Sequence, residues 1–568
     1  MKYSLLLSLF ICISFISLSS IAQNIDAQQA YDSAQHLRSK AVKKWGKDHA
    51  TKSDIADGIA ILKSALEFLQ NNHINELGEG NIYLAARKED VSIDIAKAYA
   101  IDGQNDSSIC YLEKMYEGGG VTNMYFQLIQ QDSAFINLQS NPRFIKLGDK
   151  FKKQEDLYRG TAFKTPYKQE LTDDEKIGGL TLLWSQAKYN FVYFDRLNID
   201  WNQSYLDYLP RIRAARTTAE YYRVLQTFYA QLKDGHTNVY LPKELNSEFN
   251  ARPPLRTELI QGKVFVKSVF SDSLRKEGIV PGMEILKIDS EPVLSYAEKY
   301  VAPYLSGSTR QDLDIREFSY FLLSGSAYKP VSLELKDRNG KVFTMLISKT
   351  GYRDIKAEAA IEYQTIGNVG YLTINNFEDW KIVKQFDSLF TSIIQTKGLI
   401  IDIRNNGGGN SGIGIQILRR ITDIPFTTSP AKMLKYISRP GWEVYWYNDP
   451  SEIIEPDEKR YYSKPVVLLV GARTFSAAED FAATFKFMKR GKMIGQLTGG
   501  STGEPVGFDL PGGGSARVCG KRETYPDGKE FVGIGIIPDI IISPSAEDLQ
   551  NATDSVKNKA LELINSAN

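Results

Sequence analysis

The sequence predicts a multidomain chain of mixed helix and sheet. A chain of 568 residues is too long for one hydrophobic core and should divide into several domains. Between residues 25 and 160, apolar residues recur every three to four positions, as in helices, whereas parts of 255–350 alternate apolar and polar positions, as in strands. From residue 360 onward, apolar runs and helical patterns take turns, which favours an α/β core.

The chain begins with the pattern of an export signal. A basic start at Lys2 precedes an apolar run over 5–21, and Ser20 and Ala22 are small residues of the kind that signal peptidases require. We expect residues 1–22 to be a signal peptide and the protein to be exported, either periplasmic or secreted, with no membrane span after removal of the signal. A membrane anchor is the alternative, since the run approaches the length that spans a bilayer.

Two helical segments follow. Residues 23–160 are predicted to form a helical repeat-like domain, in which the order DSSICYLEKMYEGGG then DSAFINLQSNPRFIKL resembles a degenerate tetratricopeptide (TPR-like) hairpin without a strict period. Such a domain would pack against the rest of the chain or bind a protein partner. Residues 161–250 also read as helical and end in KDGHTNVYL, where Gly235 breaks the helix and a strand begins.

The segments from residue 251 to 545 are predicted to contain β-sheets. Residues 251–350 contain a strand, a short helix, a Gly-Pro turn and a second strand, and PGMEILKIDSEPV resembles part of a PDZ domain, which binds peptides at a sheet edge. A structural copy that binds nothing is the alternative. Residues 351–545 are predicted as an α/β core, with residues 546–568 as a helical tail. We expect strands at 369–374, 398–403, 466–470 and 492–495, several of them buried on both faces.

Composition excludes several functional classes. The formal net charge is +1, so no nucleic-acid or anionic-membrane partner is expected. The chain has no CxxC and no HExxH, and we expect no cofactor and no metal. Cys110 and Cys519 lie in different predicted domains and are expected to be free thiols.

Ser476 is the candidate nucleophile. The segment VVLLVGARTFSAAEDFAATFKFM predicts a buried strand, a tight turn and a helix that begins near Ser476. A serine there lies beside backbone N–H groups and the positive end of the helix dipole, which together can stabilise an oxyanion. The structural alternative is a capping box formed with Glu479, and on this segment alone it is the stronger interpretation.

Two further features favour a catalytic role for Ser476 over a role as a helix cap. The chain has four histidines, and after residue 74 only His236 remains. A serine nucleophile needs a base that titrates near neutral pH, which histidine supplies. The glycines of RNNGGGN, residues 407–409, follow a predicted buried strand, and such a turn can present backbone N–H groups to an anion. The alternatives are a surface histidine and an ordinary glycine-rich turn.

Taken together, these segments resemble the C-terminal-processing/tricorn-type serine proteases. GLIIDIRNNGGGN, TFSAAEDFA and GIGIIPDI look like the core motifs, and LKDGHTNVYL looks like the histidine segment of the tricorn-like branch; the resemblance covers roughly residues 175–545. It implies a ClpP/crotonase-like core, with Ser476 as nucleophile. It also implies an oxyanion hole made by the N–H groups of Ala477 and of Gly408 or a neighbouring glycine.

The resemblance also bears on the base. One branch uses a lysine about 25 residues after the serine, where this chain has Ser501, so the resemblance favours the branch with a histidine base, His236. In that branch a serine precedes the histidine and a glutamate orients it. Here Gly235 precedes it, and Val532 stands where the glutamate is expected. Glu530 is the predicted orienting acid, and the alternatives are Asp234, Glu504 and Glu523.

The sequence therefore predicts an exported serine endopeptidase or processing protease that acts on peptides or unfolded proteins through an acyl-enzyme. The PDZ-like domain would present the substrate or gate the site. Two alternatives remain open at this stage. One is a peptide-binding scaffold with little or no turnover, because a poorly oriented histidine slows catalysis by orders of magnitude. The other is an esterase with the same machinery.

Overall fold

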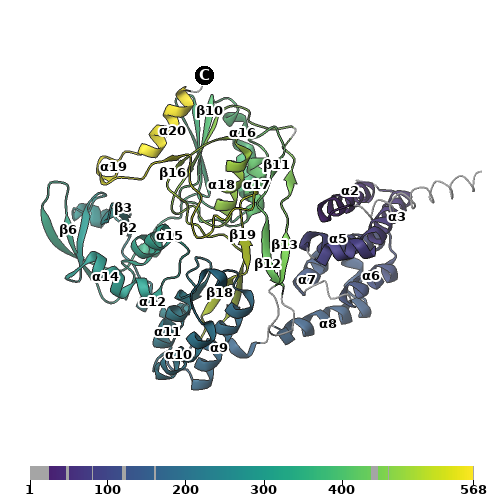
Figure 1. Cartoon of the computed structure of the whole chain (residues 1–568), viewed down its shortest axis with the longest axis horizontal. Coiled ribbons are helices and arrows are strands. Elements are labelled where there is room, and N and C mark those ends of the chain that lie inside the picture. Colours follow the sequence, from purple (N-terminus) through teal and green to yellow (C-terminus); the bar gives the residue numbers. More distant parts are fainter. Residues whose placement is uncertain are drawn as a thin grey trace, which may run out of the picture. The chain divides into compact units, whose positions relative to one another are not determined.

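The computed structural model describes residues 25–46, 50–79, 81–117, 123–158, 161–435, 445–457 and 459–566. The predicted signal peptide lies outside these residues. The chain divides into two compact units: residues 1–162 with 435–450, and residues 163–434 with 451–568. Figure 1 shows helices in the first unit and a mixture of helices and strands in the second, and the prediction of a multidomain chain of mixed helix and sheet is confirmed.

The first unit is built mainly of helices. Their apolar faces form two clusters of buried side chains, one centred on Leu62 and Val91 and the other on Phe126 and Phe144. The helices are α2 (Ala27–Trp45), α3 (Lys52–Leu69), α4 (Asn72–Glu79), α5 (Ile82–Ile101), α6 (Asn105–Glu117), α7 (Asn123–Gln131) and α8 (Pro142–Tyr158). The strand β13 (Tyr445–Asp449) joins this unit. The TPR-like character of the unit stays a prediction.

The second unit contains a six-stranded sheet that holds the site. Its strand order is β20-β16-β15-β10-β9-β8; the pairs between β20 and β9 are parallel, and β8 runs antiparallel to β9. The four strands predicted from apolar runs are confirmed as β9, β10, β15 and β16. The strands are β8 (Ile361–Ile366), β9 (Val369–Ile374), β10 (Gly398–Asp402), β15 (Val466–Val470), β16 (Gly491–Gly495) and β20 (Ile540–Ile541).

Both faces of this sheet are buried. Ile400 and Val467 pack on one face of the sheet against helix α20. Their chain neighbours, Leu399 before Ile400 and Leu468 after Val467, are also fully buried. Because side chains alternate between the faces of a strand, both faces are covered. The helices of this core are α16 (Lys381–Ile393), α17 (Ser411–Leu418), α18 (Ala477–Met488), α19 (Ala546–Asn551) and α20 (Ser555–Ser566).

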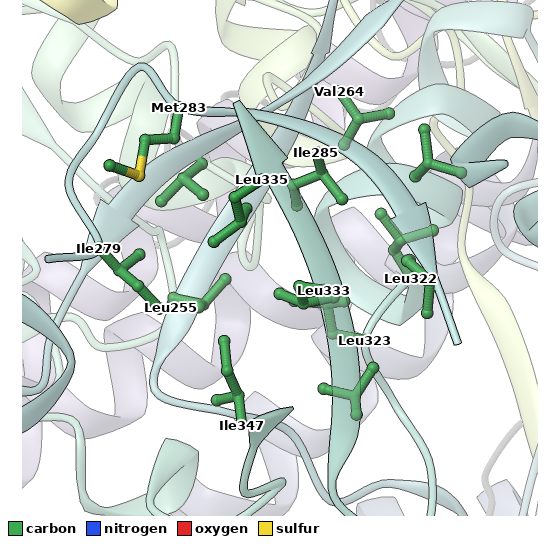
Figure 2. Close-up of a cluster of buried hydrophobic side chains, with 14 of the residues drawn as sticks. Leu255, Val264, Ile279, Met283, Ile285, Leu322, Leu323, Leu333, Leu335 and Ile347 are labelled. Atoms are coloured by element: carbon green, nitrogen blue, oxygen red, sulfur yellow. The ribbon is translucent and has the colours of Figure 1, made fainter. Parts of the chain in front are cut away.

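An antiparallel sheet of order β2-β3-β4-β6-β7, with β5 paired to β4, occupies most of residues 251–350. Figure 2 shows its core, where Val264, Ile285 and Leu333 meet. The strands are β2 (Leu255–Ile260), β3 (Lys263–Val269), β4 (Glu284–Ile288), β5 (Glu291–Pro292), β6 (Val331–Lys336) and β7 (Val342–Ile347), and the helices are α12 (Asn246–Phe249), α13 (Asp272–Lys276), α14 (Val293–Tyr300) and α15 (Arg310–Asp314). A π-helical turn, Ile315–Phe321, follows α15.

A small sheet links distant parts of the second unit. Helices α9 (Asp173–Asn190), α10 (Trp201–Ala214) and α11 (Thr218–Ala230) lead into strand β1 (Asn238–Tyr240), which pairs with β18 (Ser515–Cys519); β17 (Pro505–Asp509) pairs with β18 on its other side. This pairing brings the segment of His236 to the segment that follows Ser501. The remaining strands are β11 (Phe426–Thr427), β12 (Ala431–Lys435), β14 (Ile453–Ile454) and β19 (Lys521–Glu523).

In the part of the chain that the structure describes, we find no helix both long and apolar enough to cross a membrane.

Candidate active site

Ser476 lies at a strained turn between β15 and α18. Its backbone has φ 58° and ψ −131°, a conformation that residues with a side chain rarely adopt. The Ser476 N–H donates to the carbonyl oxygen of Ser501 at 3.0 Å, which ties the turn to the loop after β16. The strain places the Ser476 side chain on the open side of the turn, where it lines a cavity.

The capping-box interpretation of this turn is wrong. The Ser476 hydroxyl makes no cap hydrogen bond to the helix, and Glu479 does not return to the Ser476 backbone. The Glu479 carboxylate instead accepts from the backbone N–H groups of Gly500 and Ser501, at 2.7 and 2.8 Å, and from the Thr498 hydroxyl. Neither the Ser476 nor the Glu479 side chain therefore caps helix α18, although their spacing is that of a capping box.

His236 links two hydroxyl groups. Its Nε2 lies 3.0 Å from Ser476 Oγ, and its Nδ1 lies 2.9 Å from Ser501 Oγ. The ring is 3% exposed and stacks on Phe475, with the ring centroids 4.7 Å apart. Contacts on both nitrogens and on the ring face fix the orientation of the imidazole.

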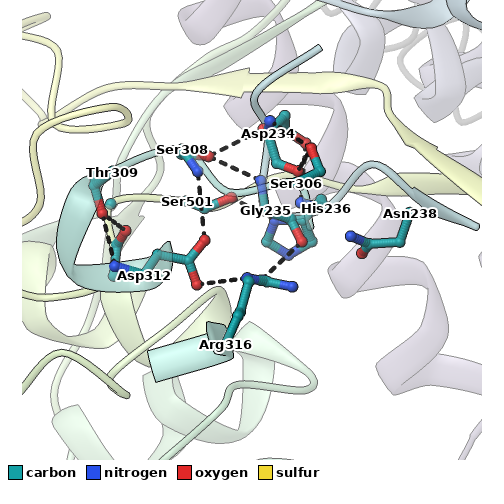
Figure 3. A network of polar contacts seen from close by, with 12 residues as sticks. Asp234, Gly235, His236, Asn238, Ser306, Ser308, Thr309, Asp312, Arg316 and Ser501 are labelled. Carbon is teal, nitrogen blue, oxygen red and sulfur yellow. Dashed lines mark hydrogen bonds and ion pairs between the residues drawn. The ribbon is translucent and has the colours of Figure 1, made fainter. Parts of the chain in front are cut away.

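The loop that carries His236 is held by a polar network, which Figure 3 shows. The Asp234 carboxylate accepts from the His236 N–H at 2.9 Å, while the Asp234 N–H donates to Ser306 Oγ at 2.9 Å. The Gly235 N–H donates to Ser308 Oγ at 2.9 Å, and its carbonyl accepts from Arg316 at 3.0 Å. Residues that follow α14 therefore brace the backbone of the histidine loop.

Gly235 occupies its position because no side chain fits there. A Cβ at Gly235 would lie 2.9 Å from Asp312 Oδ2 and 2.9 Å from the Phe475 ring. A serine at 235 would displace the ring that stacks on His236. The hydroxyl beside Nδ1 comes instead from Ser501, which is fully buried.

The electrostatics keep His236 neutral. Burial, and then the positive charges of Arg517, Arg316 and Lys521, hold the pKa of His236 well below its usual value. A neutral imidazole has a free lone pair, so it can accept a proton from Ser476.

The backbone offers N–H groups near the Ser476 side chain. The N–H of Ala477, the first residue of α18, has no hydrogen-bond partner among the described residues. Gly408 packs against the turn, since a Cβ there would lie 2.7 Å from Ser476 Cβ, but its N–H already donates to Asn406 Oδ1 at 2.8 Å. Gly407 and Gly409, which line the cavity, are the neighbours whose N–H groups have no partner within the described ranges. That Gly408 or a neighbouring glycine supplies the second N–H group stays a prediction.

Two segments of the chain match models of protease families. Residues 368–542 match the model of peptidase family S41, and residues 179–230 match the tricorn protease C1 domain. The chain therefore contains a segment that is similar to peptidase family S41. It is similar to the C-terminal processing peptidase, chloroplastic, of Tetradesmus obliquus, with 28% identity over 32% of this chain and 36% of the relative.

The chain is also similar to a probable CtpA-like serine protease of Staphylococcus epidermidis, with 23% identity over 50% of this chain and 58% of the relative. The chain thus spans only part of the length of each curated relative. The crystal structure of mature CPAF has the same fold over 70% of this chain and 98% of its own, with a TM-score of 0.56 and 18% sequence identity.

The prediction that Glu530 orients His236 is wrong. Glu530 pairs with Arg196 at 2.5 Å and with Arg522 at 3.0 Å, and the ring of His236 contacts Ser501 instead. Among the alternatives, Asp234 binds the backbone of the His236 loop rather than the ring.

The other two alternatives do not contact the His236 ring either. Glu504 is exposed where it lines the cavity, and Glu523 accepts from the Thr502 hydroxyl at 2.9 Å. Among the described residues, the hydrogen-bond partners of the His236 ring are both serines, Ser476 and Ser501.

Sequence reasoning missed Ser501 and Glu479 as parts of the site. In the sequence, Ser501 stands out only as the residue at the position of the lysine of the other branch, and the spacing of Glu479 from Ser476 predicts a helix cap. Burial raises the pKa of Glu479 to about 7, although the hydrogen bonds from Thr498, Ser501 and Gly500 lower it. A fully buried carboxyl directed at the Ser501 loop positions the hydroxyl that contacts His236.

We find no cluster of His, Cys, Asp and Glu that could hold a metal ion within the described residues.

Proposed function

We propose that this chain is a serine endopeptidase in which Ser476 is the nucleophile and His236 the general base. The 3.0 Å contact between Ser476 Oγ and His236 Nε2, at a cavity of about 470 Å³, carries the proposal. The match of residues 368–542 to peptidase family S41 supports peptidase chemistry.

The proposed reaction proceeds through an acyl-enzyme. His236 Nε2 takes the proton of Ser476 Oγ, and the oxygen attacks the peptide carbonyl carbon. The Ala477 N–H and a glycine N–H of the 407–409 turn stabilise the oxyanion. As the C–N bond breaks, the leaving amine takes the proton from His236. Water, deprotonated in turn by His236, then attacks the acyl carbon, and as the C–O bond to Ser476 breaks, His236 returns the proton to Ser476 Oγ.

Ser501 serves in this proposal as a positioning residue. When Nε2 accepts from Ser476, Nδ1 carries the hydrogen and donates it to Ser501 Oγ. This contact selects the tautomer that is able to act as a base. A serine carries no charge, so it stabilises the imidazolium less than a carboxylate would.

We also propose that the protein is exported and that its other domains bind peptides or proteins. The apolar run at 5–21 supports export, with action outside the cytoplasm on peptides or unfolded proteins. The sheet of residues 255–347 supports a PDZ-like role in presenting a peptide. The helical first unit would bind a protein partner.

Hydrolysis of denatured casein by the pure protein tests this function. Wild type should cleave it, S476A should not, and H236A should lose about 100- to 10,000-fold in kcat. Matched assays on simple esters separate a protease from an esterase. Cleavage that persists in S476A contradicts the proposal. A folded wild type that binds peptides but cleaves neither substrate would favour the non-catalytic scaffold.

A further inference from the structure

The cavity at Ser476 has a wall rich in arginine. Its volume is about 470 Å³, and among the residues that line it are three cationic side chains, those of Arg316, Arg473 and Arg517. Two carboxylates, those of Asp312 and Glu504, line it as well. The charge of this wall therefore depends on which of these groups are already paired.

Arg473 has buried donors without acceptors. It lies three residues before Ser476, in the turn between β15 and α18. Its Nε and one Nη are shielded from solvent and have no hydrogen-bond partner in the part of the chain that the structure describes. Its guanidinium lies 5.3 Å from the ring centre of Tyr320, which lines the same cavity. Buried guanidinium donors without an acceptor are unfavourable, so this position is suited to a ligand that supplies one.

The other cations differ from Arg473. Arg316 is paired, because its Nε lies 2.8 Å from Asp312 Oδ1. Arg517 donates to the neutral Asn238 Oδ1 at 2.9 and 3.1 Å and has no ion-pair partner among the described residues. Of the two carboxylates, Asp312 is thus engaged and Glu504 is exposed. With His236 held neutral, Arg473 and Arg517 leave an excess of positive charge beside the nucleophile.

We propose that this cavity binds a substrate carboxylate through Arg473, with Arg517 as a second cation. Guanidinium groups pair with carboxylates through two parallel hydrogen bonds, which fixes geometry as well as charge. Two sources share this chemistry: an acidic side chain beside the scissile bond, and the free C-terminus of a chain that is cut near its end. The proposal rests on the proposed peptidase function and names the substrate class of the same site.

Three matched peptides test the proposal with the full chain. They are fluorescein-labelled, alanine-rich octapeptides: one with a central Glu and an amidated C-terminus, one with Gln and an amidated C-terminus, and one with Gln and a free C-terminus. Wild type should cleave one of the two carboxylate peptides with a kcat/KM about 10- to 100-fold above that of the neutral peptide. Preference for the Glu peptide would identify an acidic side chain as the ligand, and preference for the peptide with the free C-terminus would identify a terminal carboxylate.

Variants of Arg473 test whether this residue causes the preference for carboxylate peptides. In R473Q the ratio of carboxylate to neutral peptide should fall to near one, and in R473K part of the ratio should return because the charge is kept. R211Q, which removes an arginine of α10 instead, should keep the wild-type ratio. Equal kcat/KM for the three peptides in wild type, or an unchanged ratio in R473Q, would overturn the proposal. Should R473Q fail to fold, as judged by circular dichroism, the wild-type ratios decide.

Binding separates this proposal from the proposed function. Fluorescence anisotropy of the same peptides with S476A measures recognition without turnover. A preference for carboxylate that is lost in the double variant S476A/R473Q supports the cavity assignment even if wild type cleaves nothing. Equal affinity for the three peptides contradicts the assignment even if wild type is an active peptidase.

Discussion

The Ser501 hydroxyl lies 2.9 Å from His236 Nδ1, on the side of the imidazole opposite Ser476. A buried neutral group therefore fills the place beside the base where serine proteases of the Ser-His-Asp type have a carboxylate. The proposed base, His236, is oriented by a hydroxyl and by a stacked ring rather than by a charge, and the pH dependence and the sensitivity to mutation should reflect this.

Removal of the Ser501 hydroxyl should slow catalysis modestly. A neutral hydrogen bond contributes about 0.5–1.5 kcal/mol, so S501A should lower kcat about 3- to 10-fold and leave KM unchanged. Steady-state kinetics on a cleaved peptide measure this. T502V is the matched control, because Thr502 bonds to Asp480 and Glu523 instead of His236, and it should stay near wild type. A loss in S501A as large as that in H236A would show that Ser501 does more than position the ring.

The acid limb of activity should lie below pH 6.5. Because burial and nearby cations lower the pKa of His236, the imidazole stays unprotonated until the pH falls well below its usual range. Arg517 is the first of these cations, so R517Q should raise the pKa and move the acid limb of kcat/KM to higher pH. The measurement is a pH profile with a neutral ester. K384Q, on helix α16, should leave the limb in place, and a downward shift in R517Q would contradict the electrostatic account.

Glu479 should make stability fall as pH rises. Its pKa in the folded protein is about 7, above the unfolded value of 4.5, so the folded state binds the proton more tightly. Its stabilising contribution is present below pH 4.5 and is lost as pH rises through 7. Relative to E479Q, wild type should lose up to about 3 kcal/mol of unfolding free energy between pH 5 and 8. Urea unfolding across that range measures the difference, and parallel pH curves for the two proteins would refute it.

Backbone strain at Ser476 should show in stability. At φ 58° an alanine keeps the strain, whereas glycine adopts this conformation freely. Both S476A and S476G remove the nucleophile, but S476G should unfold at a higher temperature and be more stable by about 1 kcal/mol. Thermal unfolding of the two inactive variants compares them directly. A more stable S476A would mean that the turn stores no strain.

Much of the core could be predicted from the sequence because its signals are local. The apolar runs at 369–374 and 466–470 mark strands buried on both faces, and the structure has strands with these same bounds. Ser476 and His236 could be paired because the chain has a single histidine after residue 74. The small number of histidines therefore predicts this pair without any knowledge of the fold.

The third member of the site could not be predicted because its contact is long-range and chemically inconspicuous. Ser501 lies 265 residues from His236 in the sequence. It is also an ordinary serine among the glycines and threonines of its loop. Glu479 carried a misleading local signal, since the Ser-x-x-Glu spacing of a capping box is also the spacing that directs a carboxylate into the neighbouring loop. Glu530 was favoured by alignment to a motif, but its carboxylate is held by arginines.

The central claim, that Ser476 is a nucleophile activated by His236, is tested most directly with an uncharged fluorophosphonate ester and the intact protein. Mass spectrometry should show one adduct per chain, located on the peptide that contains Ser476. The adduct should be absent in S476A, form about 100-fold or more slowly in H236A and form near the wild-type rate in H73A, which lacks a histidine of the helical first unit. An adduct on another serine, or labelling that is as fast in H236A as in wild type, would contradict it.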